Sequence, residues 1–183
     1  MARENKADKA ETLWRTAVHE AGHAVYAWFS DCFITVRKVT IRPGKNSLGE
    51  TFDDRRPTKT RRSDIIDDIA SYLAGMVAEE LLGLKRAACY DLDAATYLAT
   101  DLVQEQGMGR RVGLRHVDED TIVSDWLRSL IDRDIRDAMN EAYRLARKSL
   151  ARRKSAIRAV AQCLMEHQTI NTKDLERLLG PKV

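Results

Sequence analysis

The order of apolar and polar residues along the chain predicts a mostly helical protein. From Ala7 to Phe29, apolar side chains recur every three or four residues, which is the spacing of one helix face. The same spacing predicts further helices over Thr60–Leu82, Asp91–Gln106 and Thr121–Met165, the last with a break near Ala151–Ser155. A final short helix is expected after Asn171, because asparagine caps helix N-termini well.

Two short segments have the pattern of strands instead. Phe33–Ile41 alternates and is rich in β-branched residues, and Pro43-Gly44 follows as a turn signal. Ser47–Phe52 is a shorter strand candidate, and the charged stretch Asp53–Arg62 is expected to be a loop. We therefore expect a mainly α fold with a small β element, an α+β arrangement.

Composition narrows the class of protein. The 183 residues, 44% of them apolar, suffice for one domain with a real core. With 31 Lys+Arg against 28 Asp+Glu, the charge of +3 is too small to indicate nucleic-acid binding by itself. Three cysteines without a CxxC pair favour a reducing compartment. No apolar run approaches the roughly 20 residues of a membrane span, and the N-terminus lacks a signal-peptide pattern, so a cytoplasmic location is expected.

The first predicted helix contains the HExxH motif, His19-Glu20-Ala21-Gly22-His23. Residues four apart share a helix face, so His19 and His23 can direct ring nitrogens at one metal ion. Glu20 lies one residue round from that pair, where it can accept a proton from water at the metal. Because the motif falls within a strongly periodic helix, it predicts the centre of a zinc hydrolase rather than two surface histidines.

The spacing leaves the third metal ligand open. The candidates are Glu79, Glu80 and Asp91. In the helix predicted over Thr60–Leu82, Glu79 is expected nearly opposite the apolar stripe, whereas Glu80 flanks it. Asp91 begins the next helix, where it could equally be an N-cap. The pattern does not decide between Glu80 and Asp91.

Several segments together resemble the zinc-peptidase domain of the FtsH-type ATP-dependent proteases. The similar segments are Thr16–Ala24 (TAVHEAGHA), Val39–Phe52 (VTIRPGKNSLGETF), Ala74–Gly83 (AGMVAEELLG) and Asp91–Thr96 (DLDAAT). They occur in the family's order, and the resemblance extends from about Ala10 to Leu179.

The resemblance implies a zinc endopeptidase whose Zn²⁺ is bound by His19, His23 and Asp91, with Glu20 as the general base. It also implies that extended substrate pairs with an edge strand containing Leu48, Gly49, Glu50 and Thr51, through main-chain hydrogen bonds. We accordingly expect a flexible tail over residues 1–6 and one peptidase domain over 7–180. This domain would consist of a catalytic core (7–116) and a helical C-terminal part (117–180).

The sequence also departs from the family pattern. Tyr90 stands where the family has Asn before the aspartate, and Cys89 precedes it. No phosphate-binding loop and no membrane-spanning segment occur in the sequence, although the family carries both an ATPase module and membrane helices. We therefore expect cleavage of flexible or unfolded polypeptides, either unaided or with a separate ATPase partner.

Two further expectations concern partners. Analogy with the family suggests a homo-oligomeric ring, and the alternative function is a catalytically silent interaction or oligomerisation module that keeps the peptidase fold. The run from Ala142 to Met165 contains seven bases and no acid. A solvated helix face balanced by the acid-rich segments 118–120 and 132–137 explains this run better than nucleic-acid binding does.

Overall fold

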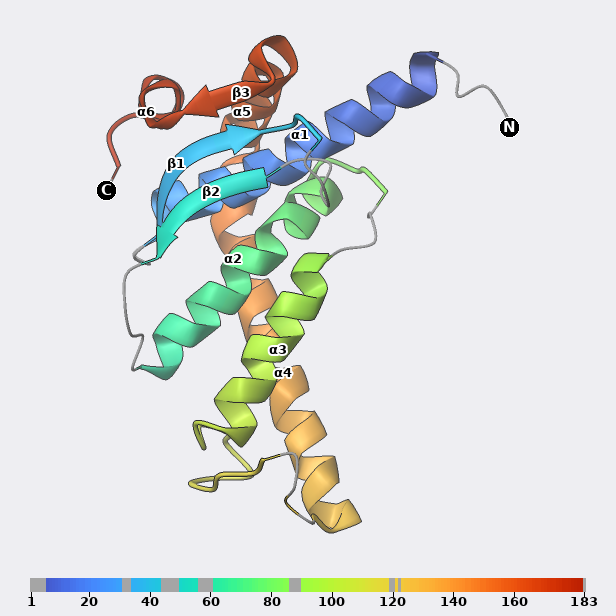
Figure 1. Ribbon diagram of the computed structural model, residues 1–183, viewed down its shortest axis with the longest axis vertical. Helices are drawn as coiled ribbons and strands as arrows, with labels where there is room; N and C mark the ends of the chain where they lie inside the picture. Colours follow the sequence, from blue (N-terminus) through green and yellow to red (C-terminus); the bar gives the residue numbers. More distant parts are fainter. Residues whose placement is uncertain are drawn as a thin grey trace. The chain divides into compact units, whose positions relative to one another are not determined.

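A computed structural model describes residues 6–30, 34–43, 50–55, 61–85, 90–118, 121 and 123–182. It confirms the mainly helical fold with a small β element (Figure 1). In chain order, the elements are α1 (Lys6–Phe29), β1 (Ile34–Thr40), β2 (Glu50–Arg55), α2 (Arg62–Leu81), α3 (Tyr90–Gln104), α4 (Asp125–Ala151), α5 (Lys154–His167), β3 (Thr169–Asn171) and α6 (Thr172–Leu179). Within the described part of the chain, no helix combines the length and apolar character that a bilayer crossing needs.

The chain forms two compact units. The first contains residues 1–57, 74–87 and 147–183, and the second contains residues 58–73 and 88–146. Helix α1, the sheet, α5 and α6 thus belong to the first unit and α3 to the second, while α2 and α4 contribute residues to both. Residues 1–5 of the tail expected over 1–6 lie outside the described residues, as do Leu48, Gly49 and Cys89, whereas Lys6 begins α1. The division at residue 116 stays a prediction.

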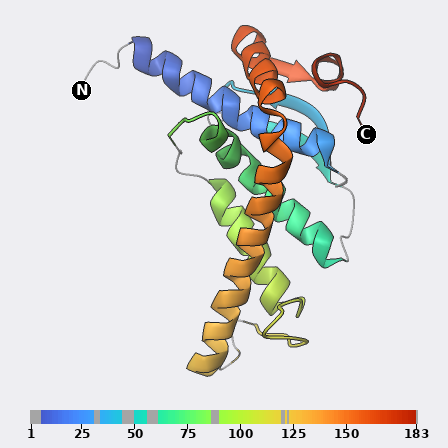
Figure 2. The same ribbon diagram turned by 180° about the vertical axis from the view of Figure 1, so that it is seen from behind.

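Helix α1 is the centre of the first unit. It contacts both β1 and α5 (Figure 2). The middle of its apolar face is fully buried, as the spacing predicts, through Ala17, Val18, Ala21, Ala24 and Val25. At its C-terminal end, the indole Nε1 of Trp28 donates a hydrogen bond to the carbonyl of Gly180 at 3.1 Å. Burial of one continuous helix face fixes the rotation of α1, and therefore the direction of its polar residues.

The sheet of this unit has the order β2-β1-β3, and both pairings are antiparallel. The expected strand over Ser47–Phe52 is wrong at its C-terminal end, because β2 continues through Asp53–Arg55, where the sequence predicts a loop. Main-chain pairing with residues 34–36 of β1 outweighs the low strand propensity of aspartate there. The three-residue strand β3 was not predicted, since it is too short to show an alternating pattern.

The predicted cap before the last helix is confirmed. The side-chain oxygen of Asn171 accepts hydrogen bonds from the backbone amides of Lys173 at 2.9 Å and Asp174 at 3.3 Å. In return, the carboxylate of Asp174 accepts a hydrogen bond from the amide of Asn171 at 3.1 Å. Because Asn171 is both the last residue of β3 and the N-cap of α6, the helix starts directly after the strand.

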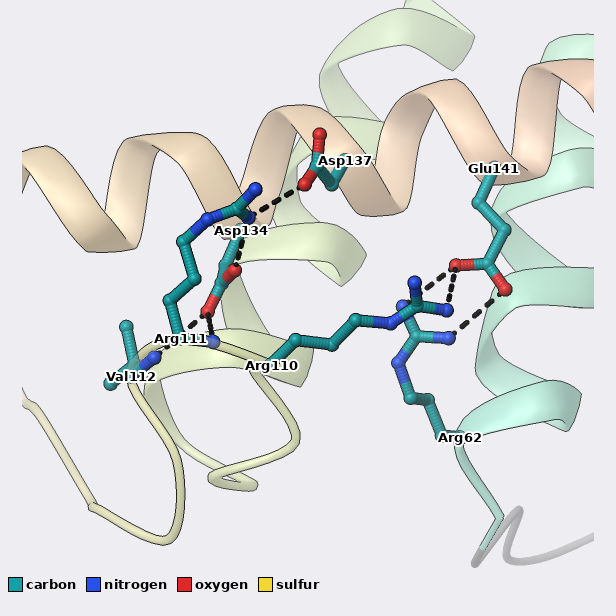
Figure 3. Close-up of polar contacts among 7 residues, drawn as sticks. All are labelled: Arg62, Arg110, Arg111, Val112, Asp134, Asp137 and Glu141. Atoms are coloured by element: carbon teal, nitrogen blue, oxygen red, sulfur yellow. Dashed lines mark hydrogen bonds and ion pairs between the residues drawn. The ribbon is translucent and has the colours of Figure 1, made fainter.

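The second unit has its own apolar core and a polar network beside it. The core consists of Val103, Val117, Leu127 and Ile131, with Val112, Val123 and Ile135 packed against it. In the network (Figure 3), the carboxylate of Asp134 accepts hydrogen bonds from the backbone amides of Arg111 at 2.7 Å and Val112 at 3.0 Å, and from the Arg111 guanidinium at 2.9 Å. A buried carboxylate on α4 therefore holds the loop that follows α3.

A second carboxylate in the same network joins the start of α2, and the same loop, to α4. Glu141 accepts both hydrogen bonds of a bidentate pair from Arg62, at 3.0 and 2.8 Å, and one from Arg110 at 3.3 Å. The side chain of Arg111 also donates to Asp137 at 2.6 Å. These ion pairs bring residues far apart in sequence to one side of α4 (Figure 3).

Two bases of the acid-free run have specific roles within the first unit. Arg147 forms an ion pair with Glu80. The guanidinium of Arg153 lies over the ring of Phe29, 4.4 Å from its centroid, which is a cation–π contact. Part of this positive charge therefore stabilises the fold.

Candidate metal centre

The HExxH segment of α1 lies against the C-terminal turns of α2 within the first unit. A side chain at Gly22 would clash here, because an added Cβ would come within 2.6 Å of the Ala74 carbonyl oxygen and of the Ala78 Cβ. The two helices thus approach each other closely at Gly22. The two helix backbones are close enough for short side chains on α2 to reach the histidines of α1.

The two histidines of the motif point at each other, as their spacing predicts. Nε2 of His19 and Nε2 of His23 lie 3.1 Å apart. The ring centroids are 4.8 Å apart, and the ring planes make an angle of 72°. Two nitrogens that share a tetrahedral Zn²⁺ at about 2.0–2.1 Å would be about 3.3–3.4 Å apart. The observed separation therefore suits two imidazole ligands of one zinc ion.

Glu79 orients the first of these rings. Its Oε1 lies 3.2 Å from Nδ1 of His19, and its side chain is only 2% exposed. A carboxylate at this position favours the tautomer that carries the proton on Nδ1, which leaves the lone pair of Nε2 directed toward His23. Carboxylate–histidine pairs of this kind typically support zinc centres.

The expected orientation of Glu79 is therefore wrong. The sequence pattern placed it nearly opposite the apolar stripe of its helix, but it is buried with Ala74, Val77 and Ala78. The last turns of α2 are buried over more than one face, and a single-stripe pattern cannot reveal a second face. The small residues Gly75 and Ala78, next to Glu79 on α2, were the available signal of a close helix contact.

Glu80, the next residue, has a different environment. Its carboxylate accepts a hydrogen bond from the guanidinium of Arg147, and its side chain is 30% exposed. This ion pair explains the position of Glu80 beside the apolar stripe. The pair gives Glu80 a structural role in the first unit.

The remaining predicted site residues are distributed as follows. Glu20 is buried on α1, with 6% of its surface exposed. Asp91 is half-buried in the first turn of α3, in the second unit, and its metal ligation stays a prediction. Glu50 and Thr51 begin β2, which is an edge strand among the described strands. Tyr90, the departure from the family pattern, is 83% exposed.

The residues present suit a zinc ion chemically. Imidazole nitrogen and carboxylate oxygen are ordinary zinc ligands, and catalytic centres commonly use two histidines and one carboxylate. An added Cβ at Gly75 would lie 2.6 Å from Nε2 of both histidines, so the absence of a side chain there leaves room at the two nitrogens.

Comparison with known proteins agrees with this geometry. A family model described as peptidase family M41 matches residues 7–178. The "ATP-dependent zinc metalloprotease FtsH 2" of Methylacidiphilum infernorum is 30% identical over 181 residues, which cover 90% of this chain and 28% of that protein. The "ATP-dependent zinc metalloprotease FTSH 11, chloroplastic/mitochondrial" of Arabidopsis thaliana is 31% identical over 173 residues, covering 91% of this chain and 21% of that protein.

A third relative matches along the whole chain. The "ATP-dependent zinc metalloprotease FtsH" of Rhodothermus marinus is 30% identical over 197 aligned residues, which cover 100% of this chain and 28% of that protein. The chain therefore spans less than a third of the length of these curated relatives.

Proposed function

The chain belongs to peptidase family M41, and from this premise we propose that it is a zinc-dependent endopeptidase acting on flexible or unfolded polypeptides. The observation that carries the proposal is the meeting of two imidazole Nε2 atoms 3.1 Å apart, with Glu79 behind one of them. This arrangement suits metal binding by the HExxH helix, and the family model and relatives of the chain are those of zinc metalloproteases.

In this proposal His19, His23 and Asp91 bind the zinc ion. Bound Zn²⁺ would supply a Lewis acid that polarises the scissile carbonyl and makes water a better nucleophile at neutral pH. The buried carboxylate of Glu20 takes the proton from the attacking water and passes it to the leaving amine. Glu79 keeps the His19 ring in the tautomer that presents Nε2.

The strand that begins at Glu50 is the proposed substrate edge. Among the described strands, β2 pairs with β1 alone. An extended polypeptide could add to its other side through main-chain hydrogen bonds, which do not depend on side-chain identity. Residues Leu48–Thr51 would then contact substrate with broad sequence tolerance.

The assigned role of Glu20 is tested by Glu20→Gln. We expect casein cleavage to fall by at least about a hundredfold, because the general base is lost. Zinc content, measured by elemental analysis, should stay equal to that of the unchanged protein. Retained cleavage in this variant would refute the role, and zinc binding without any cleavage by the unchanged protein would favour the silent interaction module.

The assigned ligand Asp91 is tested against a matched neighbour. Asp91 and Asp93 both lie in the first turn of α3, so both interact with the same helix terminus. Asp91→Asn should weaken zinc binding in a chelator competition, whereas Asp93→Asn should leave it unchanged. Equal zinc affinities of the two variants would remove Asp91 from the ligand set.

A further inference from the structure

We infer that Gly75 is a positioning residue of the metal centre, whose missing side chain leaves the space where the two imidazole Nε2 atoms meet. The inference rests on the proposed zinc site. Gly75 is a buried residue of α2, six residues before the helix ends at Leu81. An ideal Cβ placed on it would lie 2.6 Å from Nε2 and Cε1 of His19, and 2.6 Å from Nε2 of His23.

These distances are too short for van der Waals contact. An ordinary contact of a Cβ atom lies at 3.4–4 Å, and real Cβ atoms essentially never come closer than 3.0 Å. A methyl group at residue 75 would therefore push on both rings at once. It would push at the very nitrogens that are proposed to bind the metal.

Backbone conformation does not explain this glycine. Among the described residues, the glycines with positive φ are Gly83, Gly107, Gly113 and Gly180, all outside helix interiors. Gly75 has helical backbone angles that alanine would adopt more readily, because glycine is a poor helix former. Gly75 instead provides space for the imidazole rings of His19 and His23.

Gly22, on the facing helix, supplies the contrast. A Cβ at Gly22 would meet the backbone oxygen of Ala74 and the Cβ of Ala78 at 2.6 Å, and the Cα of Gly75 at 3.0 Å. All of these atoms are parts of α2 that cannot rotate away. Gly22 therefore sets the separation of the two helices, whereas Gly75 sets the clearance of the ligands.

The imidazoles are side-chain ends, so they can turn aside when a methyl group is added. The helices need not separate, and the fold should survive Gly75→Ala. The rings, however, would leave their present positions, and His19 would lose its alignment with Glu79. The expected result is a folded protein with a damaged metal centre.

The test compares Gly75→Ala, Gly22→Ala and Ser71→Ala with the unchanged protein. Ser71→Ala is the matched control, since it places alanine in the same helix, one turn before Gly75, where the serine hydroxyl donates a hydrogen bond to the Asp68 carbonyl at 2.7 Å. Zinc affinity is measured by competition with a chromophoric chelator, and stability by thermal unfolding of the metal-free protein.

For Gly75→Ala we expect zinc binding to weaken by about tenfold or more, with a metal-free Tm no lower than that of the unchanged protein. Gly22→Ala should lower the metal-free Tm, and Ser71→Ala should leave zinc affinity unchanged. A smaller loss of affinity in Gly75→Ala, or a Tm as low as that of Gly22→Ala, would overturn the inference. Absence of zinc binding by the unchanged protein would instead refute the proposed function.

Discussion

Two buried carboxylates, one in each compact unit, differ in what they hold. The side chains of Glu79 and Asp134 are both 2% exposed. Asp134 accepts hydrogen bonds from two backbone amides and from the guanidinium of Arg111. Glu79 instead faces Nδ1 of His19, whose second ring nitrogen points at His23. The same functional group at the same burial serves a loop in one unit and an imidazole in the other.

The difference lies in the partner rather than in the carboxylate. Backbone amides and an arginine side chain act only as hydrogen-bond donors to Asp134. The negative charge of Asp134 therefore only stabilises the position of a loop. An imidazole has two nitrogens, and a charge at one of them changes the basicity of the other. A buried acid paired with histidine is therefore the stronger indication of a functional centre.

The largest expected effect is on stability, in Asp134→Ala. Removal of this carboxylate leaves the amides of Arg111 and Val112 without their acceptor and breaks its ion pair with the half-exposed guanidinium of Arg111. We expect the free energy of unfolding to fall by about 2–4 kcal/mol. Zinc affinity of the folded protein should not change. Urea unfolding measures the stability, and chelator competition measures the zinc affinity. A large loss of zinc affinity with unchanged stability would contradict the structural role of Asp134.

Glu79→Gln should have the opposite signature. Loss of the charge at His19 should weaken zinc binding by about 10- to 100-fold, with a smaller effect on unfolding. Glu80→Gln is the matched control on the next residue, because it breaks the half-exposed pair with Arg147 and should change stability by less than about 1 kcal/mol. If both variants bind zinc equally, the pairing of Glu79 with His19 is only structural.

The helices could be predicted because their cause is local. The prediction of Thr60–Leu82 differs from α2 by one or two residues at each end, and that of Asp91–Gln106 differs similarly from α3. Apolar spacing along ten or more residues reports the buried face directly. The HExxH geometry followed for the same reason, since His19 and His23 are one helical turn apart.

Features that depend on distant pairing could not be predicted this way. Strand β3 exists because Ile170 pairs with Val39, 131 positions earlier in the sequence. Glu79 is buried because α1 crosses its helix, which no pattern within α2 reveals. Asp134 belongs to an acid-rich segment that was expected only to balance the basic run, but the loop at Arg111 covers it. In each case the deciding partner is remote in the sequence.

The smallest expected effect is a loss of stability in acid, and it concerns the second unit. Arg62 donates two hydrogen bonds to Glu141 and holds the pKa of that carboxyl below its ordinary value of 4.5. Arg111 lowers the pKa of Asp137 in the same way, from 3.8. A carboxyl whose pKa is depressed on folding stabilises the folded state above its unfolded pKa. That contribution disappears as the pH falls through the lower, folded pKa.

We therefore expect the contribution of these two carboxyls to the free energy of unfolding to be nearly constant above about pH 5. It should fall progressively below about pH 4.5. Exposure of Glu141 to solvent keeps the effect modest. In Glu141→Gln, urea unfolding should show less dependence on pH over this range than in the unchanged protein, while Glu80→Gln serves as a control at a glutamate of similar exposure in the first unit. An unchanged pH dependence in Glu141→Gln would mean that the pair of Glu141 with Arg62 contributes nothing measurable to stability. Among the carboxylates of the network, Asp134 alone would then stabilise the second unit.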